Sequence, residues 1–205
     1  MRDFHVFIEQ QGEQIYVGKI TGSGSEDAVF SYAQEYLDNP SSCPISIHLP
    51  LQAQNFSAEE TSLFFEGLLP EGFTRKCVAG WIHADEYDYL TILAALGREC
   101  LGAIQIIEDG MDVPKAGYQK LTKEDVCRLA KEGASEAAEL VTKAHLSLTG
   151  ASGKVGLYYK IDTNEWYLPI GAAPSTHIVK QSHVRLDGIV TNEQLCLQTD
   201  RKSVV

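Results

Sequence analysis

The first half of the chain switches between the two-residue and the helical periodicity of apolar positions. Residues 3–9 and 15–20 alternate apolar and polar side chains around a polar connection, which predicts a β-hairpin. Ser57 and Glu60 form an S-x-x-E capping box ahead of an apolar run, which predicts a helix start. The other expected elements are helices over 27–37, 74–84 and 86–97 and strands over 45–51 and 99–107. This order predicts a small α+β unit.

The second half of the chain is predicted to be richer in strands. Residues 108–120 are polar and contain Gly110, Pro114 and Gly117, which favours a linker. The expected elements beyond it are a capped helix from Thr122, strands over 145–148, 153–162, 165–170 and 176–180, and a helix over 191–199 that opens on a T-x-x-Q capping box. The whole chain is therefore predicted to be α+β, with an N-terminal α+β unit followed by a β-rich one.

Charge and cysteine content narrow the classes of function. The 205 residues carry a formal net charge of −11, which argues against broad affinity for nucleic acid or anionic membranes. The five cysteines form no CxxC pair, which favours thiols in a reducing compartment over a zinc site or a disulfide framework. No window reaches the ~18 apolar residues of a membrane helix. We expect a cytoplasmic protein without a metal site in this chain.

Residues 150–154, GASGK, are the candidate chemical motif. Glycines let backbone N–H groups approach phosphate oxygens, and a lysine offsets the phosphate charge. The Walker pattern fails here because Leu148 and Val155 stand where a glycine and a hydroxyl are needed. Two flanking predicted strands favour the geometry of a kinase glycine loop, with Lys180 on a later strand and Glu193 on the next helix. On pattern alone, an ordinary glycine-turn hairpin is an equal alternative.

Five ordered blocks of sequence resemble one known family. They read LFFEGLLPEGFTR, LAALGRECLGAIQI, LSLTGASGKVGLYY, WYLPIGAAPSTHIVK and RLDGIVTNEQLC. In this order and spacing they resemble the HipA-type toxin serine/threonine kinases of bacterial toxin–antitoxin systems. The resemblance implies a kinase linked to persistence that phosphorylates a translation component of the aminoacyl-tRNA synthetase class. It also implies neutralisation by a helix-turn-helix antitoxin of the HipB type, so that nucleic acid is met only through the antitoxin.

The same resemblance implies a division of the chain and a set of site residues. Residues 1–105 correspond to the antitoxin-contacting N-terminal subdomain, and residues 106–199 to the start of the kinase domain, its N-lobe. Ser147 matches an autophosphorylated serine, which would make the chain a phosphoprotein. The residues that match the ATP phosphate loop are Thr149, Gly150, Ala151, Ser152, Gly153 and Lys154. Lys180 matches an ATP-binding lysine, and Glu193 is its candidate partner.

Two departures from the family limit what the chain is expected to do. Ser152 and Gly153 replace the glutamine and the acidic residue of the usual loop, which favours a more flexible loop. No catalytic aspartate, downstream asparagine or Mg²⁺-binding aspartate follows Thr199, so we expect ATP and Mg²⁺ to be cofactors of the parent family and this chain alone to be inactive. Residues 200–205, DRKSVV, are expected to be a non-native tail.

Three functional hypotheses remain open on the sequence. The first is an enzyme fragment, which is the N-terminal part of such a protein kinase. The second is a non-catalytic binding module that docks an antitoxin or a separate kinase chain. The third is a nucleotide-binding regulator that uses Lys154 and Lys180 alone. Retention of the loop and both lysines beyond the linker favours the first hypothesis.

Overall fold

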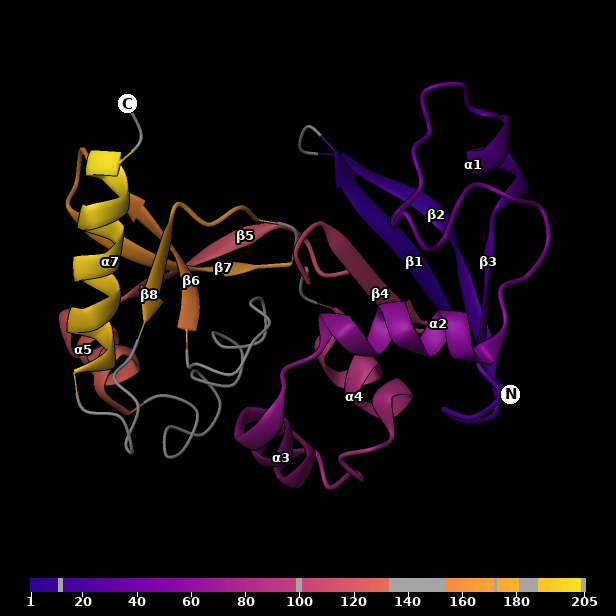
Figure 1. The fold of residues 1–205 in the computed structure, drawn as a ribbon, viewed down its shortest axis with the longest axis horizontal. Coiled ribbons are helices and arrows are strands. Elements are labelled where there is room, and N and C mark those ends of the chain that lie inside the picture. The colour runs from indigo at the N-terminus through magenta and orange to yellow at the C-terminus, as the bar shows by residue number, and fades with distance from the viewer. Residues whose placement is uncertain (11–12, 99–100, 133–153, 172, 181–187, 204–205) are drawn as a thin grey trace.

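The computed structural model describes residues 1–10, 13–98, 101–132, 154–171, 173–180 and 188–203. Within these residues the chain forms two four-stranded antiparallel sheets with helices beside each, which confirms the predicted α+β class. Figure 1 shows the two sheets as separate units, connected by the segment that runs from β4 into β5. No helix among the described residues is both long and apolar enough to cross a membrane.

The first sheet has the strand order β3-β2-β1-β4. Its strands are β1 (Arg2–Gln10), β2 (Glu13–Gly22), β3 (Val29–Tyr32) and β4 (Ile104–Glu108). The predicted hairpin is present, because β1 pairs with β2 from Arg2↔Gly22 to Gln10↔Glu13. Since β4 pairs with β1, the sheet extends to Glu108, just beyond the predicted subdomain boundary at residue 105.

Two predicted elements of this unit were wrong. The helix expected over 27–37 begins as β3, because VFSY alternates and buries Phe30 and Tyr32 against the sheet; only α1 (Gln34–Asp38) is helical. The strand expected over 45–51 is a loop with one isolated bridge, Ser46↔Leu49. The Tyr32 hydroxyl holds this loop instead, because it donates to the carbonyl of Leu49 at 2.5 Å and accepts from the amide of Ile45 at 3.1 Å.

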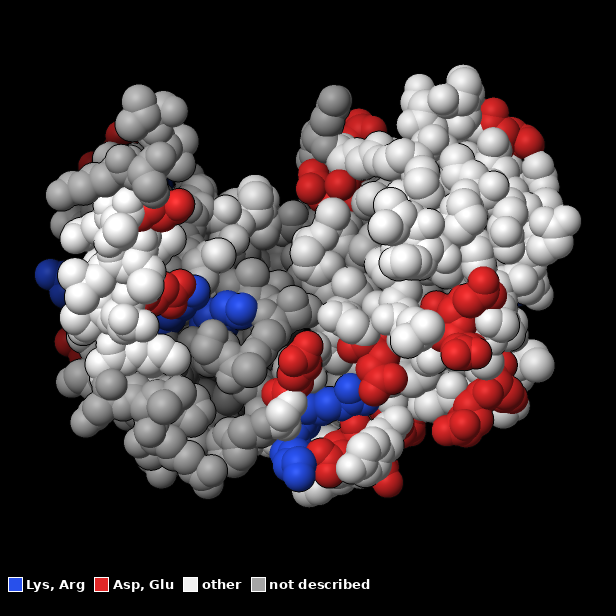
Figure 2. All heavy atoms as spheres, in the orientation of Figure 1, with Lys and Arg blue, Asp and Glu red and all other residues white. Residues whose placement is uncertain are grey.

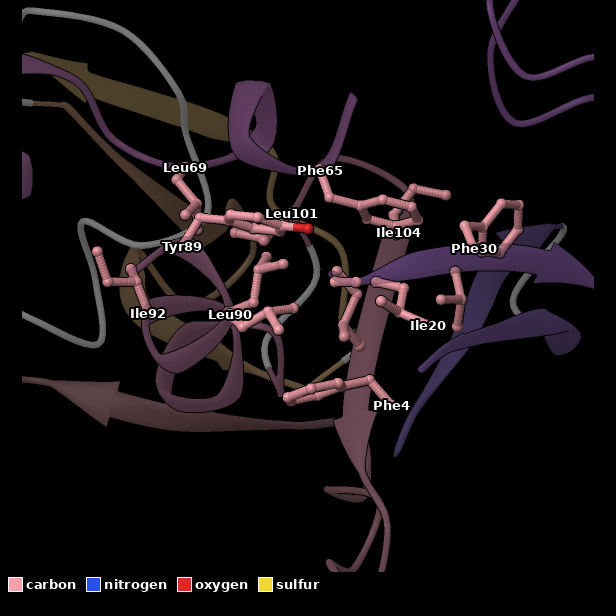
Figure 3. Close-up of a cluster of buried hydrophobic side chains, with 14 of the residues drawn as sticks. Phe4, Ile20, Phe30, Phe65, Leu69, Tyr89, Leu90, Ile92, Leu101 and Ile104 are labelled. Atoms are coloured by element: carbon pink, nitrogen blue, oxygen red, sulfur yellow. The ribbon is translucent and has the colours of Figure 1, made fainter. Parts of the chain in front are cut away.

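A cluster of short helices packs on the first sheet. The helices are α2 (Ala58–Phe65), η1 (Glu66–Leu68), α3 (Gly72–Trp81) and α4 (Tyr89–Leu96). The predicted capping box is present, since the Glu60 amide donates to Ser57 Oγ at 3.2 Å and the Ser57 amide donates to Glu60 Oε2 at 2.8 Å. Figure 3 shows Phe4, Ile20 and Phe30 of the sheet facing the side chains of the helices. This interface is the main hydrophobic core of the chain.

A polar network joins helix α4 to strands β1 and β4. Arg2 donates from Nε to Glu108 at 2.7 Å and from a terminal nitrogen to Thr91 Oγ1 at 3.0 Å. Asp88 caps α4 by accepting from the Thr91 amide at 3.2 Å, and it also accepts from Ser25 Oγ at 2.8 Å. Partial burial opposes ionisation of Asp88, but these hydrogen bonds and the charge of Arg2 outweigh it, so the pKa of Asp88 is lowered.

Replacing Asp88 by alanine is expected to reduce the free energy of unfolding by about 1–2 kcal/mol, because α4 loses its N-cap. The folded-state pKa of Asp88 lies below its unfolded value, so the carboxylate stabilises the fold above pH ~4 and this stabilisation is lost as the pH falls through the folded pKa. Urea unfolding between pH 7 and pH 2.5 measures both effects. The exposed Asp112→Ala variant is the control, and an equal loss in both variants at pH 7 would contradict the capping role.

The second sheet has the strand order β5-β7-β6-β8. The elements of this unit are β5 (Gly117–Leu121), α5 (Lys123–Glu132), β6 (Lys154–Lys160), β7 (Glu165–Ile170), β8 (His177–Lys180) and α7 (Ile189–Ser203). Its smaller core is made of Leu121, Leu129, Val155, Leu157 and Leu168, with α5 covering this face. The end of the predicted linker is therefore wrong, because residues 117–120 belong to an edge strand.

Helix α7 differs from its prediction at both ends. It begins at Ile189 rather than Thr191, so Thr191 does not cap it, and it continues past Thr199 to Ser203. Thr199 Oγ1 donates to the carbonyl of Leu195 at 2.8 Å, which is a helical contact. The first residues of the predicted non-native tail are therefore helical, and Asp200 is exposed. The strand predicted over 145–148 lies outside the described residues.

Candidate functional site

Two lysines lie side by side at one end of the second sheet. Strands β6 and β8 pair antiparallel in a register that places Lys154 directly opposite Lys180. Directly opposed side chains in an antiparallel pair have Cβ atoms about 4.5–5.5 Å apart, and like charges at this separation destabilise the sheet. The register of β6 and β8 thus brings two basic residues next to each other in a chain whose net charge is −11.

A glutamate of the following helix joins this pair. Lys180 Nζ donates to Glu193 Oε1 in an ion pair, with both side chains a little over one-third exposed. Glu193 lies in the first turns of α7, so the ion pair connects the edge strand β8 to the helix. The kinase pattern had made Glu193 the candidate partner of Lys180. Figure 2 shows basic side chains beside α7 next to an acidic one.

Alternation along β6 separates a packed face from a face that carries the lysines. Val155 and Leu157 are buried in the core that α5 covers. Lys154, Gly156 and Tyr158 belong to the other face, because successive residues of a strand point to opposite sides. Hydrophobic packing on one side of β6 thus fixes the register that brings Lys154 opposite Lys180 on the other side.

The chemistry available at this corner is anion binding. Lysine binds phosphate as a point charge. The carboxylate of Glu193 restricts the position of the Lys180 ammonium group. An anion that contacts both Lys154 and Lys180 would gain two charge-assisted contacts, while the Glu193 carboxylate holds Lys180 in place. The three residues that the sequence singled out in this part of the chain are thus brought together.

The remaining predicted site residues lie outside the described residues. These are Ser147, Thr149, Gly150, Ala151, Ser152 and Gly153. Their predicted roles, autophosphorylation for Ser147 and phosphate binding for the others, stay predictions. Lys154 is the first residue of β6, so the GASGK segment runs directly into the strand that carries the lysine pair.

An aromatic cluster on the same sheet was not predicted from the sequence. Tyr118, Tyr158 and Tyr167 come from three neighbouring strands, and the rings of Tyr118 and Tyr158 lie 4.5 Å apart. Next to them Lys120 pairs with Glu165, and hydrogen bonds from Lys120 and Tyr167 lower the pKa of Glu165 to about 2. The three tyrosines lie on the same face of the sheet. The alternation within each strand indicates this only once the order and register of the strands are known.

The described residues contain no group of three or more His, Cys, Asp or Glu side chains arranged to hold a metal ion. The candidate site consists of Lys154, Lys180 and Glu193.

Comparison with known proteins places these features in a family. Residues 11–107 match the model of the HipA N-terminal domain. The putative kinase Y4mE of Sinorhizobium fredii is 31% identical over 191 residues, which cover 89% of this chain and 44% of that protein. The serine/threonine-protein kinase toxin HipA of Shewanella oneidensis is 24% identical over 176 residues, which cover 84% of this chain and 39% of the toxin. The chain thus spans less than half the length of these two relatives.

A short relative and a solved structure complete the comparison. An uncharacterized protein of Haemophilus influenzae is 30% identical over 112 residues, which cover 53% of this chain and 98% of that protein. The solved complex of Shewanella oneidensis HipA with HipB and its operator DNA aligns with a TM-score of 0.64 and 22% identity, over 88% of this chain and 42% of that one. This likeness shows a shared fold. The family model and the kinase relatives show that the chain contains a HipA N-terminal domain and is related to HipA-type toxin kinases.

Proposed function

We propose that this chain provides the N-terminal, antitoxin-facing domain and the nucleotide-binding part of a HipA-type serine/threonine protein kinase. The observation that carries the proposal is the ion pair between Lys180 and Glu193 beside the opposed Lys154. In protein kinases a strand lysine paired with a glutamate of the following helix positions the nucleotide phosphates. The same two elements occur here in the same order, because β8 carries Lys180 and the following helix α7 carries Glu193.

ATP is the cofactor that fits the charges of this site. Lys154 and Lys180 would hold phosphate oxygens, and Glu193 would keep the Lys180 ammonium oriented toward them. ATP supplies the phosphoryl group, and Mg²⁺ neutralises phosphate charge in enzymes of this class. The described residues offer no cluster that would hold Mg²⁺, so we assign no residue of this chain to the metal.

The partners proposed for the chain follow from its relatives. A solved HipA structure of the same fold is a complex with HipB and operator DNA. We propose that residues 1–105 contact a helix-turn-helix antitoxin of the HipB type, so that DNA is met through the antitoxin. A net charge of −11 supports this indirect contact, because the chain by itself would repel a phosphate backbone. The proposed protein substrate of the parent kinase is a translation component of the aminoacyl-tRNA synthetase class.

Isothermal titration of the chain with ATP tests the nucleotide site. We expect saturable binding that weakens as salt concentration rises, since two lysines supply the phosphate contacts. The Lys160→Met variant is a matched control, because Lys160 lies at the exposed far end of the same strand. Absence of binding in the wild-type chain would contradict a phosphate site at Lys154 and Lys180. So would a loss of ATP affinity in the Lys160→Met variant as large as that in the Lys180→Met variant.

The alternative is a non-catalytic module that docks an antitoxin or a separate kinase chain. The observation in its favour is the short Haemophilus influenzae relative, which this chain covers almost completely, so a protein of that length exists in the same sequence group. Under this alternative a HipB-type antitoxin co-purifies with the chain and ATP does not bind. Under the kinase proposal both ligands bind.

A further inference from the structure

Strand β8, which carries Lys180, is a four-residue strand at the edge of the second sheet. In the described sheet it pairs with β6 alone, from Lys154↔Lys180 to Leu157↔His177. His177 and Ile178 are exposed, so little apolar burial holds this strand in place. The position of Lys180 therefore depends on how β8 is attached to β6.

The alternation of side chains along β8 does not by itself fix this position. A shift of the strand by one residue would move the side chain of Val179 away from the second core, so packing excludes it. A shift by two residues keeps every side chain on its own face, but it moves Lys180 about 7 Å along β6 and away from Lys154. Only a contact between specific atoms of the two strands excludes this second shift.

Thr176, directly before β8, makes such a contact at the end of the strand remote from Lys180. Its backbone amide donates to the carbonyl of Leu157 at 3.0 Å, and its Oγ1 accepts from the amide of Tyr159 at 2.9 Å. The hydroxyl thus bonds to an amide of β6 that lies beyond the residues paired with β8. Because one residue makes both bonds, they fix Thr176 at one place on β6 and the start of β8 with it.

The neighbouring His177 provides a second partner for this hydroxyl. Thr176 Oγ1 lies 2.8 Å from His177 Nδ1, so the hydroxyl donates to the ring when Nδ1 carries no proton. The centroid of the His177 ring lies 5.6 Å from that of Tyr159 and 5.4 Å from that of Trp166, both in edge-to-face contact. His177 lies on the face of the strand opposite to Lys180, because successive residues alternate. These contacts therefore leave the lysine face open to a ligand.

We propose that Thr176 is a positioning residue, which holds β8 in the register that places Lys180 opposite Lys154. The inference rests on the proposed nucleotide site and names a residue on which that site depends without contact to the ligand. Thr176 lies four residues before Lys180, about 13 Å along an extended strand, so it acts through the register of β8. Loss of the hydroxyl leaves a fraction of the molecules with β8 displaced, and the apparent affinity for ATP falls with the fraction that keeps the register.

The test is isothermal titration of ATP into the full chain with Thr176→Val, which keeps the shape of the side chain and removes its hydrogen bonds. We expect ATP affinity to fall about three- to tenfold, the factor by which one hydrogen bond shifts an equilibrium. Thr176→Ser keeps the hydroxyl and should bind ATP within about twofold of the wild type. Thr21→Val makes the same substitution on β2 of the first sheet and should leave ATP affinity unchanged.

A double variant shows whether Thr176 acts through the lysine. In a Lys180→Met background, Thr176→Val should cause no further loss of ATP affinity, because a residue that acts only through Lys180 has no effect once that lysine is gone. If Thr176→Val weakens ATP binding equally with and without Lys180, the loss comes from damage to the sheet and the assignment is overturned. Wild-type affinity in the single Thr176→Val variant would overturn it as well.

A second measurement separates the positioning role from the nucleotide site. If the wild-type chain does not bind ATP, the proposed nucleotide site fails, and hydrogen exchange of the β8 amides then decides the role of Thr176. Faster exchange in Thr176→Val than in Thr176→Ser supports a residue that holds β8 on β6. Equal exchange in the two variants overturns it.

Discussion

Replacing Lys180 by methionine is expected to weaken ATP binding by roughly ten- to a hundredfold. Methionine keeps most of the aliphatic length and removes the charge, and a hydrogen bond to a charged group contributes about 1.5–3 kcal/mol. The ion pair with Glu193 is lost at the same time, which releases α7 from the edge of β8. Isothermal titration of the variant against the wild-type chain measures the change in affinity.

Glu193→Gln separates the two contributions of this ion pair. If Glu193 orients Lys180, the variant should lose several-fold in ATP affinity while keeping both lysines. If Glu193 only offsets the positive charge, removing its carboxylate should strengthen the binding of an anionic ligand. An increase in ATP affinity would therefore contradict the positioning role.

Replacing Phe30 by alanine is expected to destabilise the N-terminal unit by about 3–5 kcal/mol. The side chain is fully buried, and its ring lies 5.3 Å from that of Phe65 and 5.9 Å from that of Phe56. The backbone of Phe30 also connects β3 to the loop and to α2, through the amide of Phe56 at 2.9 Å and Thr61 Oγ1 at 2.9 Å. A cavity here removes the contacts that place α2 on the sheet.

Hydrogen exchange measured peptide by peptide shows how far this loss spreads. Phe30 and Leu157 belong to separate cores, so Phe30→Ala should increase exchange in β1–β4 and leave β5–β8 unchanged. The Leu157→Ala variant, in the second core, should do the reverse. Loss of protection across both sheets in either variant would show that the chain unfolds as one unit, against the predicted division near residue 105.

Local signals were sufficient for several features of the fold. The capping box of Ser57 and Glu60 depends on residues three apart and is present, and so is the first hairpin. The misread β3 shows the limit of such signals, because its four residues fit a short strand and the start of a helix equally well. Burial of Phe30 between the sheet and the helices decided the outcome, and that burial depends on residues far along the chain.

The candidate site was predictable in part. Glu193 was the candidate partner of Lys180 because protein kinases carry a glutamate on the helix after the lysine strand, and the described structure contains this ion pair. The cluster of Tyr118, Tyr158 and Tyr167 was not predictable, because Tyr118 is separated from Tyr158 by a helix and meets it only through the strand order β5-β7-β6-β8. No periodicity within a single segment encodes that order.

The most direct test of the nucleotide site is a backbone amide spectrum of the ¹⁵N-labelled chain, recorded as ATP is added. The account predicts that the largest shifts fall on Lys154, Lys180 and Glu193, while the amides of β1–β4 stay in place. Shifts that fall mainly on the first sheet, or no saturable shifts at all, would contradict the claim that this corner of the second sheet binds the nucleotide.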